Sequence, residues 1–139
     1  MKVFNLHFEG SILDEKRSNL PTYSGVYLVY CGTLSEDHKF LRCREIIYIG
    51  QAMDIRLRHS DHERRKDFLA QLRLGEVLFY SYAKVEVSLL DRIENALIYH
   101  QKPSLNDKGK ECYLYPDTEI DSDGQCALLD RQIIVKTTM

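Results

Sequence analysis

The first eighteen residues lack a hydrophobic run, because they carry six charged side chains among short apolar segments. A signal peptide or a membrane-spanning helix needs a longer uninterrupted apolar stretch than any found there. We therefore expect a cytoplasmic protein without a membrane partner.

Cysteine is scarce, and its four positions (Cys31, Cys43, Cys112 and Cys126) lack the close pairs from which tetrahedral zinc sites are usually built. We also find no zinc-finger, helix-turn-helix or basic-arm pattern in this sequence, the modules that commonly give a protein its DNA sequence specificity. Cys31 and Cys43 would face each other across a hairpin, but a disulfide is unusual in the cytosol. We expect reduced thiols.

Proline and glycine are also sparse, with three and seven residues, and the chain has neither a repeat nor a low-complexity linker. A chain of 139 residues, 44% of them hydrophobic, is about one domain long and can fill a modest core. We expect a single domain spanning residues 1–139.

The pattern of apolar residues predicts three strands and three helices, followed by a tail. β-branched and aromatic residues favour strands at 25–31, 45–49 and 77–87, with a long polar hairpin connection at 32–44. Asp54 and Asp61 are typical helix caps, and a Ser88/Asp91 capping box opens a helix that Pro103 stops near residue 101. The tail offers two β-like runs, 112–115 and 132–135, separated by an acidic loop.

Charge is unevenly distributed along a chain whose net charge is −2. Residues 39–73 contain nine Lys or Arg against five Asp or Glu, while the rest of the chain is acidic. Such a run either solvates a helix face or contacts nucleic acid. The candidate DNA contacts are Arg42, Arg44, Arg56, Arg64, Arg65 and Lys66.

Six residues are candidates for chemistry, and each has an ordinary structural alternative: Tyr27, Tyr48, Arg58, His62, Glu94 and Asn106. Strand tyrosines are more often core aromatics, and an Arg and a His four apart are usually solvated surface. Glu94 lies at the margin of a helical apolar stripe formed by Leu90, Ile93, Leu97 and Ile98. Asn106 lies in Pro-Ser-Leu-Asn, where a turn that bonds its own backbone is the common use.

The order of these motifs is more informative than any one of them. Gly-Val-Tyr (25–27), Tyr-Ile-Gly (48–50), the Arg58/His62 segment, Ile-Glu-Asn-Ala-Leu-Ile and Pro-Ser-Leu-Asn together resemble the GIY-YIG nuclease family. Residues 20–27 are especially similar to the start of the nuclease module in the bacterial excision-repair incision subunit. The resemblance covers a core at about residues 20–106 and leaves 107–139 as an extension.

The resemblance implies an α+β fold, in which a small antiparallel three-stranded sheet is flanked by helices, here with a short C-terminal β-like tail. It implies site roles for Tyr27, Tyr48, Arg58, His62, Glu94 and Asn106, and structural turns at Gly25 and Gly50. The implied activity is metal-dependent DNA endonuclease cleavage by one Mg²⁺ or Mn²⁺ ion, held by Glu94, and a tyrosine-activated water. Physical chemistry allows this, because magnesium often uses only one or two protein carboxylates.

Other interpretations stay open at this point. The same fold would serve as an inactive nucleic-acid-binding module, or the acidic tail would contact a basic partner. Within the nuclease class, the sequence distinguishes neither repair from restriction nor one tyrosine from the other as general base. Twenty residues separate Tyr27 from Tyr48, about twice the usual connection, and we predict that this excursion approaches DNA. Specificity would then come from this small domain, a protein partner or a homo-oligomer.

Overall fold

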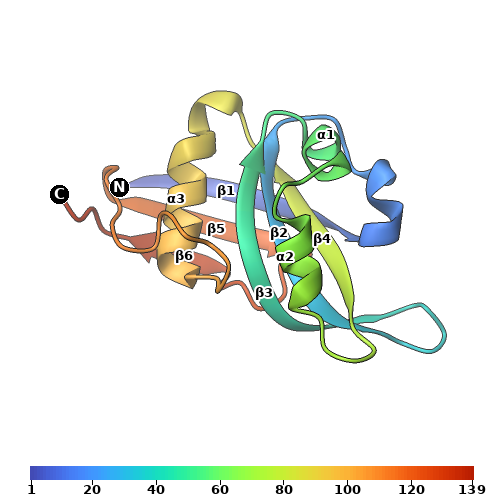
Figure 1. Ribbon diagram of the computed structural model, residues 1–139. Coiled ribbons are helices and arrows are strands. Elements are labelled where there is room, and N and C mark those ends of the chain that lie inside the picture. Colours follow the sequence, from blue (N-terminus) through green and yellow to red (C-terminus); the bar gives the residue numbers. More distant parts are fainter.

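The computed structural model describes residues 1–139 and contains one six-stranded sheet in the order β3-β2-β4-β1-β5-β6 (Figure 1). The strands are β1 (Lys2–Leu13), β2 (Gly25–Leu34), β3 (Leu41–Ala52), β4 (Val77–Lys84), β5 (Thr118–Gly124) and β6 (Gln132–Val135). The helices are α1 (Ile55–Ser60), α2 (Arg65–Ala70) and α3 (Leu90–Gln101), with short 3₁₀ helices η1 (Asp14–Asn19) and η2 (Val87–Leu89). No helix in the structure is long and apolar enough to cross a membrane.

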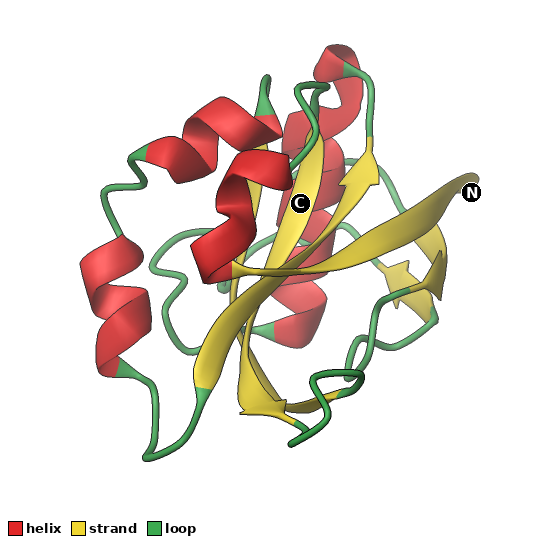
Figure 2. Cartoon of the chain, turned by 90° about the vertical axis from the view of Figure 1, so that its right-hand side faces the viewer, coloured by secondary structure: helices red, strands yellow, loops and turns green.

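The predicted fold class was wrong, because the sheet is twice as wide as a three-stranded one and is mixed. β1 pairs in parallel with β5 and antiparallel with β4, and the other neighbours are antiparallel. Figure 2 shows the sheet strongly twisted and curled, with few helices around it. The three expected strands form one end of this larger sheet, in the order β3-β2-β4.

The sequence interpretation missed two strands, β1 and β5. In both, buried side chains alternate with more exposed ones. In β1, Phe4, Leu6 and Phe8 are buried between exposed neighbours, which is the period-two pattern of a strand with one covered face. β5 lies inside the predicted acidic loop, where the apolar side chain of Ile120 is buried while the acidic residues on either side remain partly exposed. Residues 112–115 form no strand, and β6 confirms the second predicted run.

β2 is buried on both faces, which divides the hydrophobic interior into two cores. Val26, Leu28 and Tyr30 belong to a larger core that α3 covers together with β1, β5 and β6. The alternate residues Tyr27 and Val29 belong to a smaller core that includes residues of α1 and α2. In Figure 1 the edge strand β3 lies between α3 on one side and α1 and α2 on the other. Side chains from both layers therefore meet at β3.

The connection between β2 and β3 is also shorter than predicted. The two strands stay paired as far as Leu34 opposite Leu41, with two register shifts, so that only residues 35–40 form the loop. Arg42 and Arg44 consequently lie within β3 and not in a free excursion. The polar composition of this segment reflects an exposed hairpin end, which was misread as a loop.

The helix boundaries follow local signals only in part. Asp54 caps α1 as predicted, its carboxylate accepting the Leu57 N–H at 3.0 Å. α2 is shorter than expected and begins at Arg65, because Asp61 ends α1 and caps no second helix. α3 stops before Pro103 as predicted, with Lys102 in a left-handed conformation, but no Ser88 capping bond forms at its start.

Candidate functional site

Three of the six candidate residues, Tyr48, Glu94 and Asn106, line a hollow of about 560 Å³ beside the edge strand β3, whereas Tyr27, Arg58 and His62 are not part of its lining. This site hollow is lined by residues that include Tyr48, Glu63, Arg64, Glu94, Asn106 and Lys108. Tyr48 comes from β3 and Glu94 from α3, while Glu63 and Arg64 precede α2. Lys108 was not predicted from the sequence.

Tyr27 lies behind Tyr48, with the two ring centroids 6.3 Å apart and the rings roughly parallel. Its side chain is buried against Gly50, the residue directly opposite it on β3. A Cβ atom at Gly50 would lie 2.3 Å from the Tyr27 ring and hydroxyl, so only glycine admits this approach.

The predicted turn roles of Gly25 and Gly50 were therefore wrong, because both glycines lie within paired strands. Gly25 is required for a different close approach, since an added Cβ would lie 2.2 Å from the carbonyl oxygen of Ala83 on β4. Each glycine thus serves strand packing, and Gly50 does so at the site itself.

His62 connects Tyr27 to the start of α2. Its Nε2 lies 2.8 Å from the Tyr27 hydroxyl, and its Nδ1 accepts the Arg64 backbone N–H at 3.1 Å. A neutral imidazole carries one hydrogen, so the acceptor role of Nδ1 places that hydrogen on Nε2. His62 therefore donates to the Tyr27 oxygen, which leaves the tyrosine's own hydrogen free for another acceptor.

The two phenols experience opposing electrostatic effects. Burial raises the pKa of both Tyr27 and Tyr48, and the negative charge of Glu94 acts in the same direction. The positive charge of Arg58 lowers the pKa of both. Arg58 thus favours a phenolate at both positions, as a general base would require, and Arg64 acts in the same direction on Tyr48.

A second histidine, His59, is a feature of this site that sequence reasoning missed. It is buried between Tyr27 and Tyr80, with ring centroids 4.3 and 4.4 Å away, and its Nε2 has no hydrogen-bond partner. Burial lowers the pKa of His59 to about 3 and that of His62 to about 4, so both are neutral at pH 7. His59 follows the buried Ile55 by four residues on α1, which was the available signal.

Arg58 forms a two-pronged ion pair with Glu63, in which Nη1 donates to Oε2 and Nη2 donates to Oε1 at 2.8 Å. The guanidinium is the first cause that lowers the pKa of Glu63, to about 2. Arg58 lies on α1 and His62 lies beyond its end, so the two do not share a helix face. They converge on Tyr27 from different segments.

Glu94 is a half-buried carboxylate at the margin of α3, and burial raises its pKa. Gln51 approaches it at 3.4 Å while donating a shorter bond of 2.7 Å to the exposed Asp91. No group of three or more His, Cys, Asp or Glu residues is arranged to hold a metal ion. A single largely unsatisfied carboxylate suits a hydrated Mg²⁺ ion, which keeps most of its waters.

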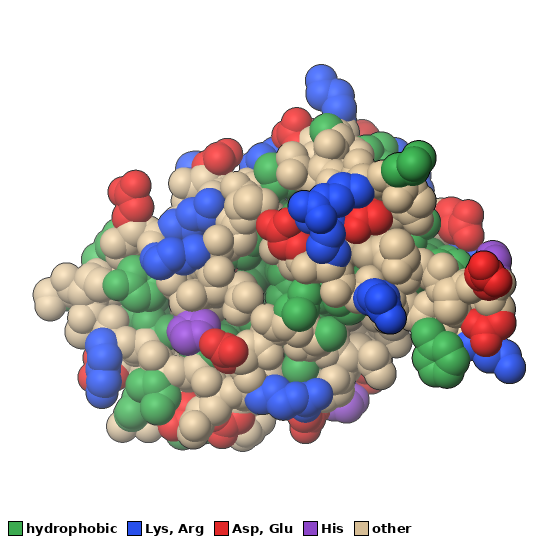
Figure 3. Space-filling model, turned by 90° about the horizontal axis from the view of Figure 1, so that it is seen from below, with side chains coloured by type: hydrophobic (Ala, Val, Ile, Leu, Met, Phe, Trp, Pro, Cys, Tyr) green, Lys and Arg blue, Asp and Glu red, His purple; other side chains and the backbone are tan.

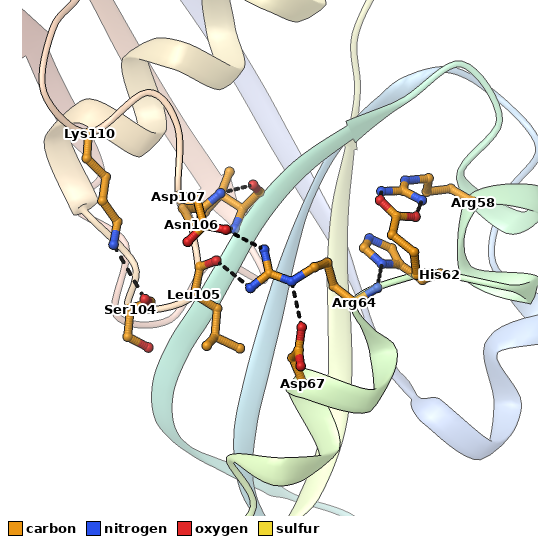
Figure 4. A network of polar contacts seen from close by, with 11 residues as sticks. Arg58, His62, Arg64, Asp67, Ser104, Leu105, Asn106, Asp107 and Lys110 are labelled. Atoms are coloured by element: carbon orange, nitrogen blue, oxygen red, sulfur yellow. Dashed lines mark hydrogen bonds and ion pairs between the residues drawn. The ribbon is translucent and has the colours of Figure 1, made fainter.

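Asn106 anchors the loop after α3 to the strand that carries Tyr48. Its side-chain oxygen accepts the Ile49 N–H at 2.9 Å, and its amide donates to the Ile49 carbonyl at 2.8 Å. Arg64 reinforces this loop by donating to the Leu105 carbonyl and to Asp107 (Figure 4). Asn106 is buried and bonds another element's backbone, so the structure gives it a positioning role.

The predicted DNA contacts are differently engaged. Arg44 pairs with Glu76, Arg65 pairs with Asp14, and Arg56 donates to the Leu20 carbonyl. Arg64 also pairs with Asp67, whereas Arg42 and Lys66 are exposed and have no ion pair or side-chain hydrogen bond. Figure 3 shows acidic and basic side chains interspersed over the lower face. A DNA role for these six residues stays a prediction.

Comparison with known proteins returned a relative that agrees with the motif resemblance. The chain is similar to UvrABC system protein C. The protein from Fervidobacterium nodosum is 31% identical to it over 110 residues, which cover 75% of this chain. The match spans only 17% of that relative's length. No family model and no solved structure matches the chain.

Proposed function

We propose that this chain is a metal-dependent DNA endonuclease that hydrolyses phosphodiester bonds with one divalent cation and a tyrosine-activated water. The observation that carries the proposal is the hydrogen bond between Tyr27 and His62, with Arg58, Tyr48 and Glu94 grouped around it. The similarity to UvrABC system protein C supports a nuclease-related role with DNA as substrate.

In this proposal Tyr27 is the general base. A phenolate at Tyr27 would accept the Nε2–H of His62 and be stabilised by the charge of Arg58, two forms of support that oppose the effect of burial. The backbone bond from Arg64 keeps His62 in the donating tautomer. His62 therefore stabilises the base and does not itself remove the tyrosine's proton.

Arg58 would bind the scissile phosphate, because a planar guanidinium donates to two phosphate oxygens at once. Glu94 would hold the divalent cation at the wall of the site hollow, with Tyr48 beside it. When bound there, Mg²⁺ or Mn²⁺ would supply positive charge to the phosphate and its leaving oxygen. Asn106 keeps the intervening backbone of β3 in place.

The decisive experiment incubates the purified protein with supercoiled, linear, branched and damaged DNA in Mg²⁺ or Mn²⁺ and maps the ends of any product. We expect cleavage of at least one substrate, loss of cleavage with EDTA, and loss of cleavage in Glu94→Gln. Comparison of Tyr27→Phe with Tyr48→Phe assigns the base: the larger loss belongs to Tyr27. Full activity in both variants would remove the tyrosine-base mechanism.

A second function is an inactive nucleic-acid-binding module of the same fold. The observation that favours it is the engagement of Arg58 by Glu63 together with the burial of Tyr27, which both oppose catalysis. DNA affinity without nicking of any tested substrate, in either metal, would establish this alternative in place of the nuclease.

A further inference from the structure

The guanidinium that the proposed mechanism requires for phosphate is already occupied. Both terminal nitrogens of Arg58 donate to the two carboxylate oxygens of Glu63. A carboxylate held in this two-pronged way presents two anionic oxygens to Arg, which is also how phosphate oxygens are bound. Glu63 thus provides, from within the chain, the type of anion that Arg58 would take from DNA.

The exposure and the contacts of Glu63 would allow its side chain to separate from Arg58. Its side chain is 67% exposed, whereas that of Arg58 is 27% exposed, and no other residue hydrogen-bonds its carboxylate. It lies in the short segment between the end of α1 and the start of α2. Rotation of this one side chain into solvent would free the guanidinium without disturbing either helix.

A second Arg–Glu pair in the same protein shows what a fixed pair looks like. Glu76 receives two hydrogen bonds from Arg44, but its side chain is only 6% exposed and it also accepts the Arg73 backbone N–H at 2.8 Å. That pair joins Arg44 of β3 to the residue that directly precedes β4. The carboxylate of Glu63, by contrast, accepts no hydrogen bond from any residue other than Arg58 and its own backbone N–H.

We propose that Glu63 is an internal competitor that occupies the phosphate-binding position of Arg58 and is displaced when DNA binds. The inference rests on the proposed nuclease function and names how access to its phosphate position is regulated. Because Arg58 lowers the pKa of Glu63 to about 2, a change of pH between 5 and 8 does not release the carboxylate. Only a competing anion does so.

The test measures the affinity of labelled DNA in a Glu94→Gln background, which prevents cleavage. We expect Glu63→Gln to bind about fivefold more tightly, the range set by the strength of an exposed ion pair. Glu63→Asp, which keeps the charge but shortens the reach, should also bind more tightly. Glu86→Gln is the control for net charge, because Glu86 is exposed and outside every ion pair of the structure.

A double-mutant cycle ties the effect to Arg58. In an Arg58→Ala background, Glu63→Gln should bring no more gain than the charge control. The proposal is overturned if Glu63→Gln binds no better than Glu86→Gln, or if its full gain persists without Arg58.

A probe that needs no DNA separates this inference from the proposed function. Titration with inorganic pyrophosphate, followed by the side-chain NMR signals of Arg58, should saturate at a lower concentration in Glu63→Gln than in the wild type. If no DNA is cleaved but pyrophosphate still competes with Glu63, the nuclease proposal fails and the competition stands. If the two titrations coincide, the competition fails whatever the activity.

Discussion

The two cores on opposite faces of β2 differ in what they contain. The larger core, covered by α3, is built of aliphatic and aromatic side chains such as Leu28 and Leu97. The smaller core contains Tyr27 packed on the buried histidines His59 and His62. One face of the strand therefore serves stability, while the other accepts the cost of burying polar groups, as expected where a site is built.

The largest effect on stability should come from the apolar face. Leu97→Ala removes a completely buried side chain of α3 and should lower the free energy of unfolding by about 2–5 kcal/mol. Denaturant unfolding measures this loss. The specific activity of the folded fraction should stay unchanged, and a selective loss of activity would blur the distinction between the two faces.

Arg58→Ala tests the face of β2 that carries Tyr27, where we expect a loss of activity and not of stability. Removal of the group that would stabilise developing phosphate charge should lower the cleavage rate about 10²–10³-fold, with little change in the melting temperature. The rate is measured under single-turnover conditions. Lys136→Ala removes an exposed positive charge from the tail and serves as control. Unchanged cleavage by Arg58→Ala would remove it from the site.

Gly50→Ala should affect both properties. The new Cβ must displace the Tyr27 ring, which should cost about 1–3 kcal/mol of stability and reduce cleavage by moving Tyr27 from His62. Gly32→Ala is the matched control, because its Cβ would also collide with the neighbouring strand, at the far end of the same hairpin. Equal activity losses in the two variants would show that general strain, and not the Tyr27 position, is responsible.

The smallest effect concerns acid stability. The pKa values of His59 and His62, about 3 and 4 in the folded protein, lie below the ordinary value of 6.5. Between pH 6.5 and these values the unfolded chain binds protons that the folded protein does not, so stability is complete above pH 6.5 and falls as the pH is lowered.

Melting temperatures measured between pH 7.5 and 4.5 would show this loss of stability. The decrease in melting temperature over this range should be smaller in His59→Phe than in the wild type. His38→Gln, which changes an exposed histidine outside every ion pair and side-chain hydrogen bond of the structure, is the control. An identical slope in His59→Phe and the wild type would mean that His59 does not bear the predicted linkage.

Local signals in the sequence predicted several features correctly. Asp54 caps α1 because its carboxylate meets an N–H three residues away, and α3 ends before Pro103 because proline restricts the residue preceding it. The apolar stripe of α3 placed Glu94 at the boundary of the core, where the structure finds it half-buried. Each of these outcomes depends on neighbours within one or two helical turns.

The partners of charged side chains were beyond the reach of the same reasoning. Arg65 and Arg44, whose contact with DNA stays a prediction, pair in the structure with Asp14 and Glu76, which are 51 and 32 residues away along the chain. His59 of α1 likewise packs against Tyr80, which comes from β4. A sequence pattern shows that a charge is present, but the fold decides which opposite charge it meets.

By itself, the sequence determined the strand-helix order of residues 25–101 and the residue types available to the proposed phosphate site, because periodicity, caps and motif order are local properties. Only the tertiary structure decided the width of the sheet, since the parallel pairing of β1 with β5 joins segments more than a hundred residues apart. The tertiary structure also decided that Glu63 pairs with Arg58 and that His62 hydrogen-bonds the Tyr27 hydroxyl. Side chains on separate segments come within contact distance only when the chain folds.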